Sequence, residues 1–169
     1  MLGRGRYKCD MGQQSLAIYL RNHEAAAQAG RDLFRRTAAN QRDRPYAAQL
    51  AELAAEVEED LDSLHAIMRA ARVSPDLVQG LALRLGERVG RLKPNGRLLG
   101  RAPLSDLIEV EALLVAVRAK AAGWQAVSSV PAPDWSETAD TQVLYERALD
   151  QADRLNEIHR TAASRVFTT

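Results

Sequence analysis

The chain is poor in the residues that build disulfide scaffolds, stacking surfaces and membrane spans. Cys9 is the only cysteine among 169 residues. An intramolecular disulfide and a cysteine-based zinc site are therefore excluded, and the composition suits a reducing compartment such as the cytoplasm. Aromatic residues make up only 5% of the chain, and the formal net charge is +1. A nearly neutral chain has no strong overall attraction to nucleic acid or to an anionic membrane.

Long hydrophobic runs are also missing. The longest, residues 112–117, is far too short to cross a bilayer. The first ten residues are rich in charge and have no apolar centre, so they do not resemble a signal peptide. We therefore expect a cytoplasmic protein that does not interact with membranes.

Helix-forming residues dominate what is present, because Ala, Leu, Arg and Glu are abundant and β-branched runs are rare. Four segments repeat apolar residues at helical spacing: 15–39, 45–71, 103–127 and 136–165. We expect an all-α protein in which residues 15–169 form one helical bundle and residues 1–14 form a polar N-terminal extension. Ser136 is the expected cap of the last helix.

Two of these segments carry the clearest patterns. The second has a seam of alternating three- and four-residue steps, typical of left-handed bundle packing: Leu50, Leu53, Val57, Leu61, Leu64, Met68 and Ala71. Its other faces are acidic and include Asp60 and Asp62; we expect Glu58 and Asp62 to lie on a solvated face. The third is apolar on two faces, one formed by Leu104, Ile108, Val115 and Ala122 and the other by Val110, Leu113, Leu114, Val117 and Trp124. A helix that is apolar nearly all round is buried on more than one side. We therefore expect the surplus face to meet either the preceding connection or a second subunit, with a homodimer favoured.

The connection between the second and third segments, about residues 73–103, is long. Ser74-Pro75-Asp76 is a typical helix start, and Lys93-Pro94-Asn95-Gly96 predicts a turn after a short helix. A helix of about 25 residues is roughly 37 Å long, and the connection is long enough to return along it. The third helix would then run parallel to the second. The alternative is an up-down-up-down bundle with a short helix inserted.

Acidic residues and histidines recur in order along the four segments. Glu24 lies on the first, Asp62-x-x-His65 on the second, Glu111 on the third and Asn156-x-x-His159 on the fourth. This order resembles the ferritin-like superfamily, where two helices each give a Glu and two each give Glu-x-x-His to a pair of metal ions. The stretch 90–107, followed by Glu109 and Glu111, also looks like a group of uncharacterised actinobacterial proteins.

The resemblance implies a four-helix bundle whose long crossover, between the second and third helices, contains a short helix. It would place iron or manganese at Glu24, Asp62, His65, Glu111 and His159, as in a carboxylate oxidase. The chain departs from the pattern because Asp62 is short and Asn156 is neutral. At about 100° per residue, Asp62 and His65 lie off the apolar seam, Glu24 lies at a flank and His23 points inward. Only Glu111 falls in the middle of an apolar face. We therefore expect no cofactor and no catalytic residue, and favour a bundle that acts by protein–protein association.

A basic patch in the connection gives a second alternative. Arg88, Arg91, Lys93 and Arg97 lie close together there and predict an anion or nucleic-acid site. The connection has no aromatic residue on which bases could stack, which argues against nucleic acid. Neutralisation of the acidic second helix is the favoured interpretation.

Overall fold

A computed structural model describes residues 4–75, 102–131 and 135–168, with side chains from Met11 onward. This part of the chain is all-helical and contains no strand. Its four helices are α1 (Arg4–Asn40), α2 (Ala47–Ala70), α4 (Pro103–Ser128) and α5 (Thr141–Phe167). The prediction of an all-α bundle with four long helices is confirmed. The short helix expected in the connection and the turn expected at Lys93-Pro94-Asn95-Gly96 lie outside the described residues.

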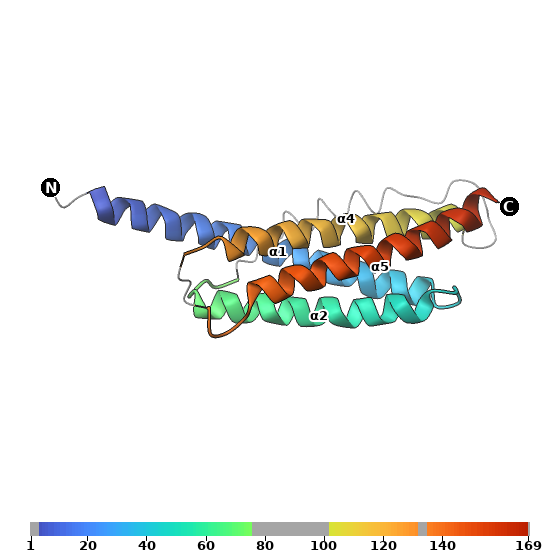
Figure 1. Ribbon diagram of the computed structural model, residues 1–169, viewed down its shortest axis with the longest axis horizontal. Helices are drawn as coiled ribbons and strands as arrows, with labels where there is room; N and C mark the ends of the chain where they lie inside the picture. The colour runs from blue at the N-terminus through green and yellow to red at the C-terminus, as the bar shows by residue number, and fades with distance from the viewer. Residues whose placement is uncertain (1–3, 76–101, 132–134, 169) are drawn as a thin grey trace.

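The helices pack side by side along most of their length (Figure 1). α1 contacts α2 and α4, while α5 contacts α4 and α2. Followed by colour from N- to C-terminus, α2 and α4 run in one direction and α1 and α5 run in the other (Figure 1). α2 therefore ends, and α4 begins, at opposite ends of the bundle. The first turns of α1 project beyond the other helices.

The starts of three helices differ from expectation. α1 begins at Arg4 rather than near Ser15, because residues 4–14 contain no proline that would stop the helix. α5 begins at Thr141, where Asp140, and not Ser136, accepts hydrogen bonds from the Gln142 and Val143 amides. α2 begins at Ala47, after a turn that includes Pro45.

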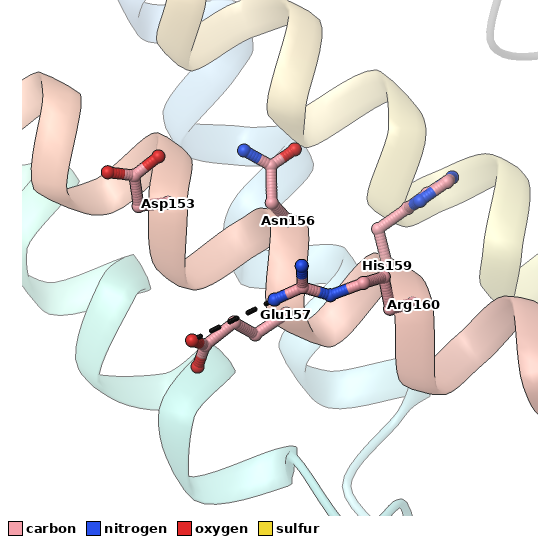
Figure 2. A pocket seen from close by; sticks show the side chains of 5 residues that line it. All are labelled: Asp153, Asn156, Glu157, His159 and Arg160. Atoms are coloured by element: carbon pink, nitrogen blue, oxygen red, sulfur yellow. Dashed lines mark ion pairs between the residues drawn. The ribbon is translucent and has the colours of Figure 1, made fainter.

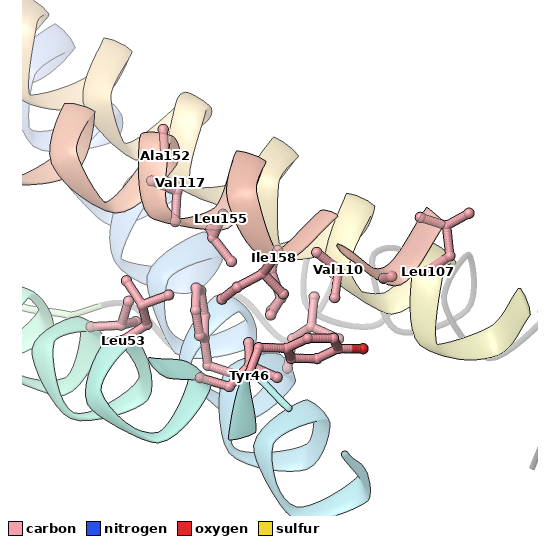
Figure 3. Packing of buried hydrophobic residues seen from close by; sticks show 14 residues of the cluster. Tyr46, Leu53, Leu107, Val110, Val117, Ala152, Leu155 and Ile158 are labelled. Atoms are coloured by element: carbon pink, nitrogen blue, oxygen red, sulfur yellow. The ribbon is translucent and has the colours of Figure 1, made fainter. Parts of the chain in front are cut away.

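Two clusters of buried apolar side chains fill the interior. The first lies around Phe34, Tyr46 and Leu53 and includes α4 and α5 residues (Figure 3). The second contains Trp124 and Trp135, which pack together with Leu20, Ile67 and Met68. The predicted seam of α2 is confirmed from residue 50 to residue 68, where all six members are buried, while Ala71, just after the helix, is partly buried. Burial of these side chains supplies the main driving force for folding.

Hydropathy along the described helices gives no membrane span. None of them combines the length and apolar character that a bilayer crossing requires.

Candidate functional site

The most concentrated set of interior charges lies where α2, α4 and α5 meet. The Asp60 carboxylate is 3% exposed and accepts hydrogen bonds from Lys120 of α4 and Arg147 of α5. Gln151 is fully buried; its side-chain oxygen accepts from Lys120 and its amide donates to Asp60 Oδ2 over 3.2 Å. Three helices are thus joined through one carboxylate, which we call the Asp60 cluster.

The Asp60 cluster continues outward through Glu56. Gln151 Nε2 donates to Glu56 Oε2 over 3.0 Å, and Arg154 donates to the same oxygen. Desolvation alone would raise the pKa of Glu56, but the hydrogen bonds from Arg154 and Gln151 outweigh it and lower the pKa. Burial lowers the pKa of Lys120, against the opposing attraction of Asp60. A lowered lysine pKa opposes folding at neutral pH, and that penalty fades as pH rises from the folded pKa towards 10.5.

Asp60, expected on an acidic face of α2 outside the apolar seam, is buried. It lies three residues after Val57 and four before Leu64, so its side chain falls on the flank of the apolar seam and not on the opposite face of α2. Lys120 and Gln151 are the polar residues that face it from α4 and α5. Asp60, Lys120 and Gln151 each lie three or four residues from buried apolar residues of their own helix. Such spacing of a polar residue on three helices is the sequence signal that could have revealed the cluster.

The first predicted Glu–His combination lies inside the α1–α2 hairpin. His65 Nε2 is 3.2 Å from Glu24 Oε1, and Gln28 donates to the same oxygen. The Glu24 side chain is 3% exposed and that of His65 is 31% exposed. Glu24, expected at a flank of the apolar stripe, is buried there because the contact between two helices covers that flank.

The second combination lies on the surface of the α4–α5 hairpin. His159 Nε2 is 3.0 Å from Glu111 Oε1, and their side chains are 31% and 53% exposed. Glu111 was expected at the centre of a buried apolar face and is instead exposed, because that face of α4 points outward. Beside this pair, Arg118 Nη2 lies 3.4 Å from Asn156 Oδ1.

The two Glu–His pairs occupy different levels of the bundle. His23 contacts Gly123, where an added Cβ would lie 2.9 Å from the imidazole ring. Glu24 is therefore level with about residue 122 of α4, eleven residues from Glu111 and hence about 17 Å away along the axis. Metal ions in two-metal sites are about 3.5–4 Å apart.

The five candidate metal residues accordingly do not converge on one site. Asp62 is exposed on α2, and the two Glu–His pairs are separate. Across the part of the chain that the structure describes, no group of three or more His, Cys, Asp or Glu side chains is placed to hold an ion. The described residues do not fit a di-iron or di-manganese centre.

His23 has a role in packing instead. Its ring lies 4.4 Å from that of Tyr19, centroid to centroid, and fills the space that Gly123 leaves open. Burial lowers the pKa of His23.

A shallow hollow on α5 is lined by Asp153, Asn156, Glu157, His159 and Arg160 (Figure 2). Glu157 and Arg160 form an ion pair of 3.9 Å across it. All five lining residues come from one helix, so the hollow is a feature of the surface between successive turns. Within the described parts of the chain, no second element forms a wall that could enclose a substrate there.

The outward side of α4 carries an apolar stripe. Leu104 is 50% exposed and Val115 is 68% exposed. Along the same line Ile108 is half-buried, and three alanines are exposed. We call this stripe the α4 ridge; its members are Leu104, Ile108, Val115, Ala119, Ala122 and Ala126. At about 100° per residue all six point within about 40° of the direction of Val115. The exposed Glu111 lies at the same angle on the α5 edge of the ridge, between Ile108 and Val115.

Arg88, Arg91, Lys93 and Arg97, the predicted anion patch, lie outside the described residues. The acidic side chains of α2 have other cationic partners: Arg35 of α1 pairs with Glu58, and Arg147 also pairs with Glu59. No family model, curated protein or solved structure matches the chain.

Proposed function

We propose that the protein works by association with a second copy of itself through the α4 ridge. The observation that carries this proposal is the exposure of Val115, a β-branched apolar side chain 68% open to solvent at the centre of the ridge. Leu104 is also half exposed. Exposed apolar side chains that line one face of a helix are typical of an interaction site.

The composition of α4 supports this proposal. Its inward side already supplies Leu107, Val110, Leu113, Val117 and Trp124 to the interior. Among the residues that the structure describes, the ridge is therefore not used for packing within one chain. Its members follow one another at steps of three, four or seven residues, the spacing by which two helices pack side by side. Covering it would remove apolar surface from water at about 25 cal/mol per Å².

Association fits the described interior better than catalysis does. The Asp60 cluster joins oppositely charged groups to one another, and its lysine and carboxylates are engaged in mutual hydrogen bonds. A charge network closed in this way stabilises one arrangement of helices. The hollow on α5 is open and lies on one helix.

We also infer a ferritin-like topology with a lengthwise crossover between α2 and α4. The shared direction of α2 and α4 supports this inference, because α2 ends at the end of the bundle opposite the start of α4 (Figure 1). The single cysteine supports a cytoplasmic location.

Light scattering coupled to size-exclusion chromatography tests the proposed self-association. The wild type is expected to be a dimer whose fraction rises with concentration. Val115→Glu places two like charges in the interface and is expected to give a monomer. Val143→Glu is the matched control, because Val143 on α5 is a valine of similar exposure, 57%, away from the ridge. A wild type that stays monomeric at a concentration of several hundred micromolar, roughly a hundred times the Kd expected for a weak interface, overturns the proposal.

A further inference from the structure

The α4 ridge is asymmetric in side-chain size. Its large members, Leu104 and Ile108, lie before Val115, and its small members, Ala119, Ala122 and Ala126, lie after it. The spacing is matched: Ile108 and Ala122 are each seven residues from Val115, and Leu104 and Ala126 are each eleven residues from it. Reversal of the helix about Val115 therefore exchanges large positions for small ones.

We infer that two copies pack α4 against α4 in antiparallel orientation, with Val115 on the two-fold axis. This inference rests on the proposed function and specifies its geometry. Ile108 then packs on the partner's Ala122, and Leu104 packs on the partner's Ala126. Large side chains facing small ones fill the interface at close to interior density. Parallel pairing would oppose large with large at one end and leave gaps between alanines at the other.

Charges beside the ridge favour the same orientation. Glu111 and Arg118 both lie on its α5 side, as their contacts with His159 and Asn156 demonstrate. A two-fold axis perpendicular to α4 keeps each residue on its own side of the seam. Antiparallel packing about Val115 therefore brings Glu111 to the partner's Arg118, and the symmetry repeats this pair. Parallel packing, about an axis along α4, would move the partner's Arg118 to the opposite side of the seam and to a different level, so this pair would not form.

The length of the ridge sets the expected strength. From Leu104 to Ala126 it spans 22 residues, or about 33 Å of helix. One helix pair of this length buries less than the roughly 1,600 Å² of a standard interface. We expect a reversible dimer with a Kd of the order of micromolar.

Single cysteines placed on the ridge test the orientation directly. In a Cys9→Ser background, Val115→Cys is expected to form a disulfide dimer under mild oxidation. Ile108→Cys alone is not, because two copies of residue 108 would be about 21 Å apart in the antiparallel arrangement. A mixture of Ile108→Cys and Ala122→Cys proteins, one tagged to change its mass, is expected to give the mixed dimer. Circular dichroism of each variant verifies that the bundle is folded.

The outcomes separate the geometry from the proposed function. Efficient disulfide formation by Ile108→Cys alone, or none by Val115→Cys in a protein that is dimeric by light scattering, overturns the antiparallel geometry and leaves self-association standing. A wild type that is monomeric overturns both the antiparallel geometry and self-association. This is the result expected if another part of the same chain covers the ridge.

Exchange of the flanking charges gives a second, independent readout. Glu111→Arg and Arg118→Glu are each expected to raise the dimer Kd about 5-fold or more, because each sets like charges opposite one another at two symmetric positions. The double variant with both substitutions restores the pairing and is expected to return to within about 2-fold of the wild type. A double variant weaker than either single variant contradicts the antiparallel register.

Discussion

Two carboxylate–imidazole contacts, one in each hairpin, use the same atoms in opposite surroundings. Glu24–His65 and Glu111–His159 have Nε2–Oε1 distances of 3.2 and 3.0 Å, and the two histidines are equally exposed at 31%. The difference lies in the carboxylate, which is buried in Glu24 and more than half exposed in Glu111. The chain thus contains a matched pair in which the solvation of one partner is the main variable. The energetic role of each contact is expected to follow that solvation rather than its distance.

Asp60 extends the comparison to a carboxylate as buried as Glu24 but with two cationic partners. Asp60→Ala removes the shared counter-charge of Lys120 and Arg147, whose side chains are 16% and 29% exposed; Arg147 keeps its contact with Glu59, whereas Lys120 loses its carboxylate partner. We expect Asp60→Ala to lower the free energy of unfolding by about 3–5 kcal/mol, measured by urea denaturation.

Asp62→Ala is the control for that measurement, because Asp62 is an exposed carboxylate on the same helix. It is expected to change stability by less than about 0.5 kcal/mol. If Asp60→Ala does not fold, the isosteric Asp60→Asn gives the smaller, measurable loss. Equal effects at positions 60 and 62 would contradict the importance of burial.

His65→Ala should give the next largest effect. It leaves the Glu24 carboxylate buried, with the Gln28 amide as its remaining side-chain partner among the described residues. An under-satisfied buried acceptor costs about 1–3 kcal/mol. Denaturation of His65→Ala, Glu24→Gln and the double variant would give the coupling energy of the pair. A coupling energy near zero would mean that burial of Glu24 does not strengthen the contact.

Helical periodicity predicted the four helices and the α2 seam well, because both depend on spacing within one segment. It did not predict the burial of Glu24 and Asp60 or the exposure of Glu111, for a shared reason. A helical wheel gives the angle between residues but not which neighbouring helix covers a flank. Glu24 and Asp60 lie at flanks that α2, α4 and α5 close, so they are buried. α4 is apolar on two sides, and the wheel alone could not decide that the side containing Leu104 and Val115 points outward.

The position of each candidate ligand along the bundle axis could likewise not be predicted from the sequence. Matching motifs in the two hairpins paired Glu24 with Glu111, but axial position depends on how the hairpins slide past one another. The contact between His23 and Gly123 fixes that offset. Close approach at a glycine was the physical clue, and only the fold could identify which side chain fills it.

The side chain of Glu56 is 26% exposed, which lies between the exposed fractions of Glu24 and Glu111. Its pKa is lowered in the folded protein, where hydrogen bonds from Arg154 and Gln151 overcome desolvation. Its contribution to stability is therefore present above pH 4.5 and is lost as pH falls through the folded pKa. Glu56→Gln should cost about 1 kcal/mol at neutral pH and progressively less in acid. Parallel stability–pH curves for wild type and variant would contradict this assignment.

His159→Ala is expected to have the smallest effect and makes the comparison decisive. Its removal returns the exposed Glu111 carboxylate to water, so the loss should stay below about 0.5 kcal/mol and shrink further in salt. The removed imidazole is as exposed as that of His65 and lies no farther from its carboxylate. The ratio of the His65→Ala and His159→Ala losses, measured in the same buffer and denaturant, isolates the effect of carboxylate burial. Similar losses would mean that the side chains' packing, and not the desolvation of Glu24, determines what each histidine contributes.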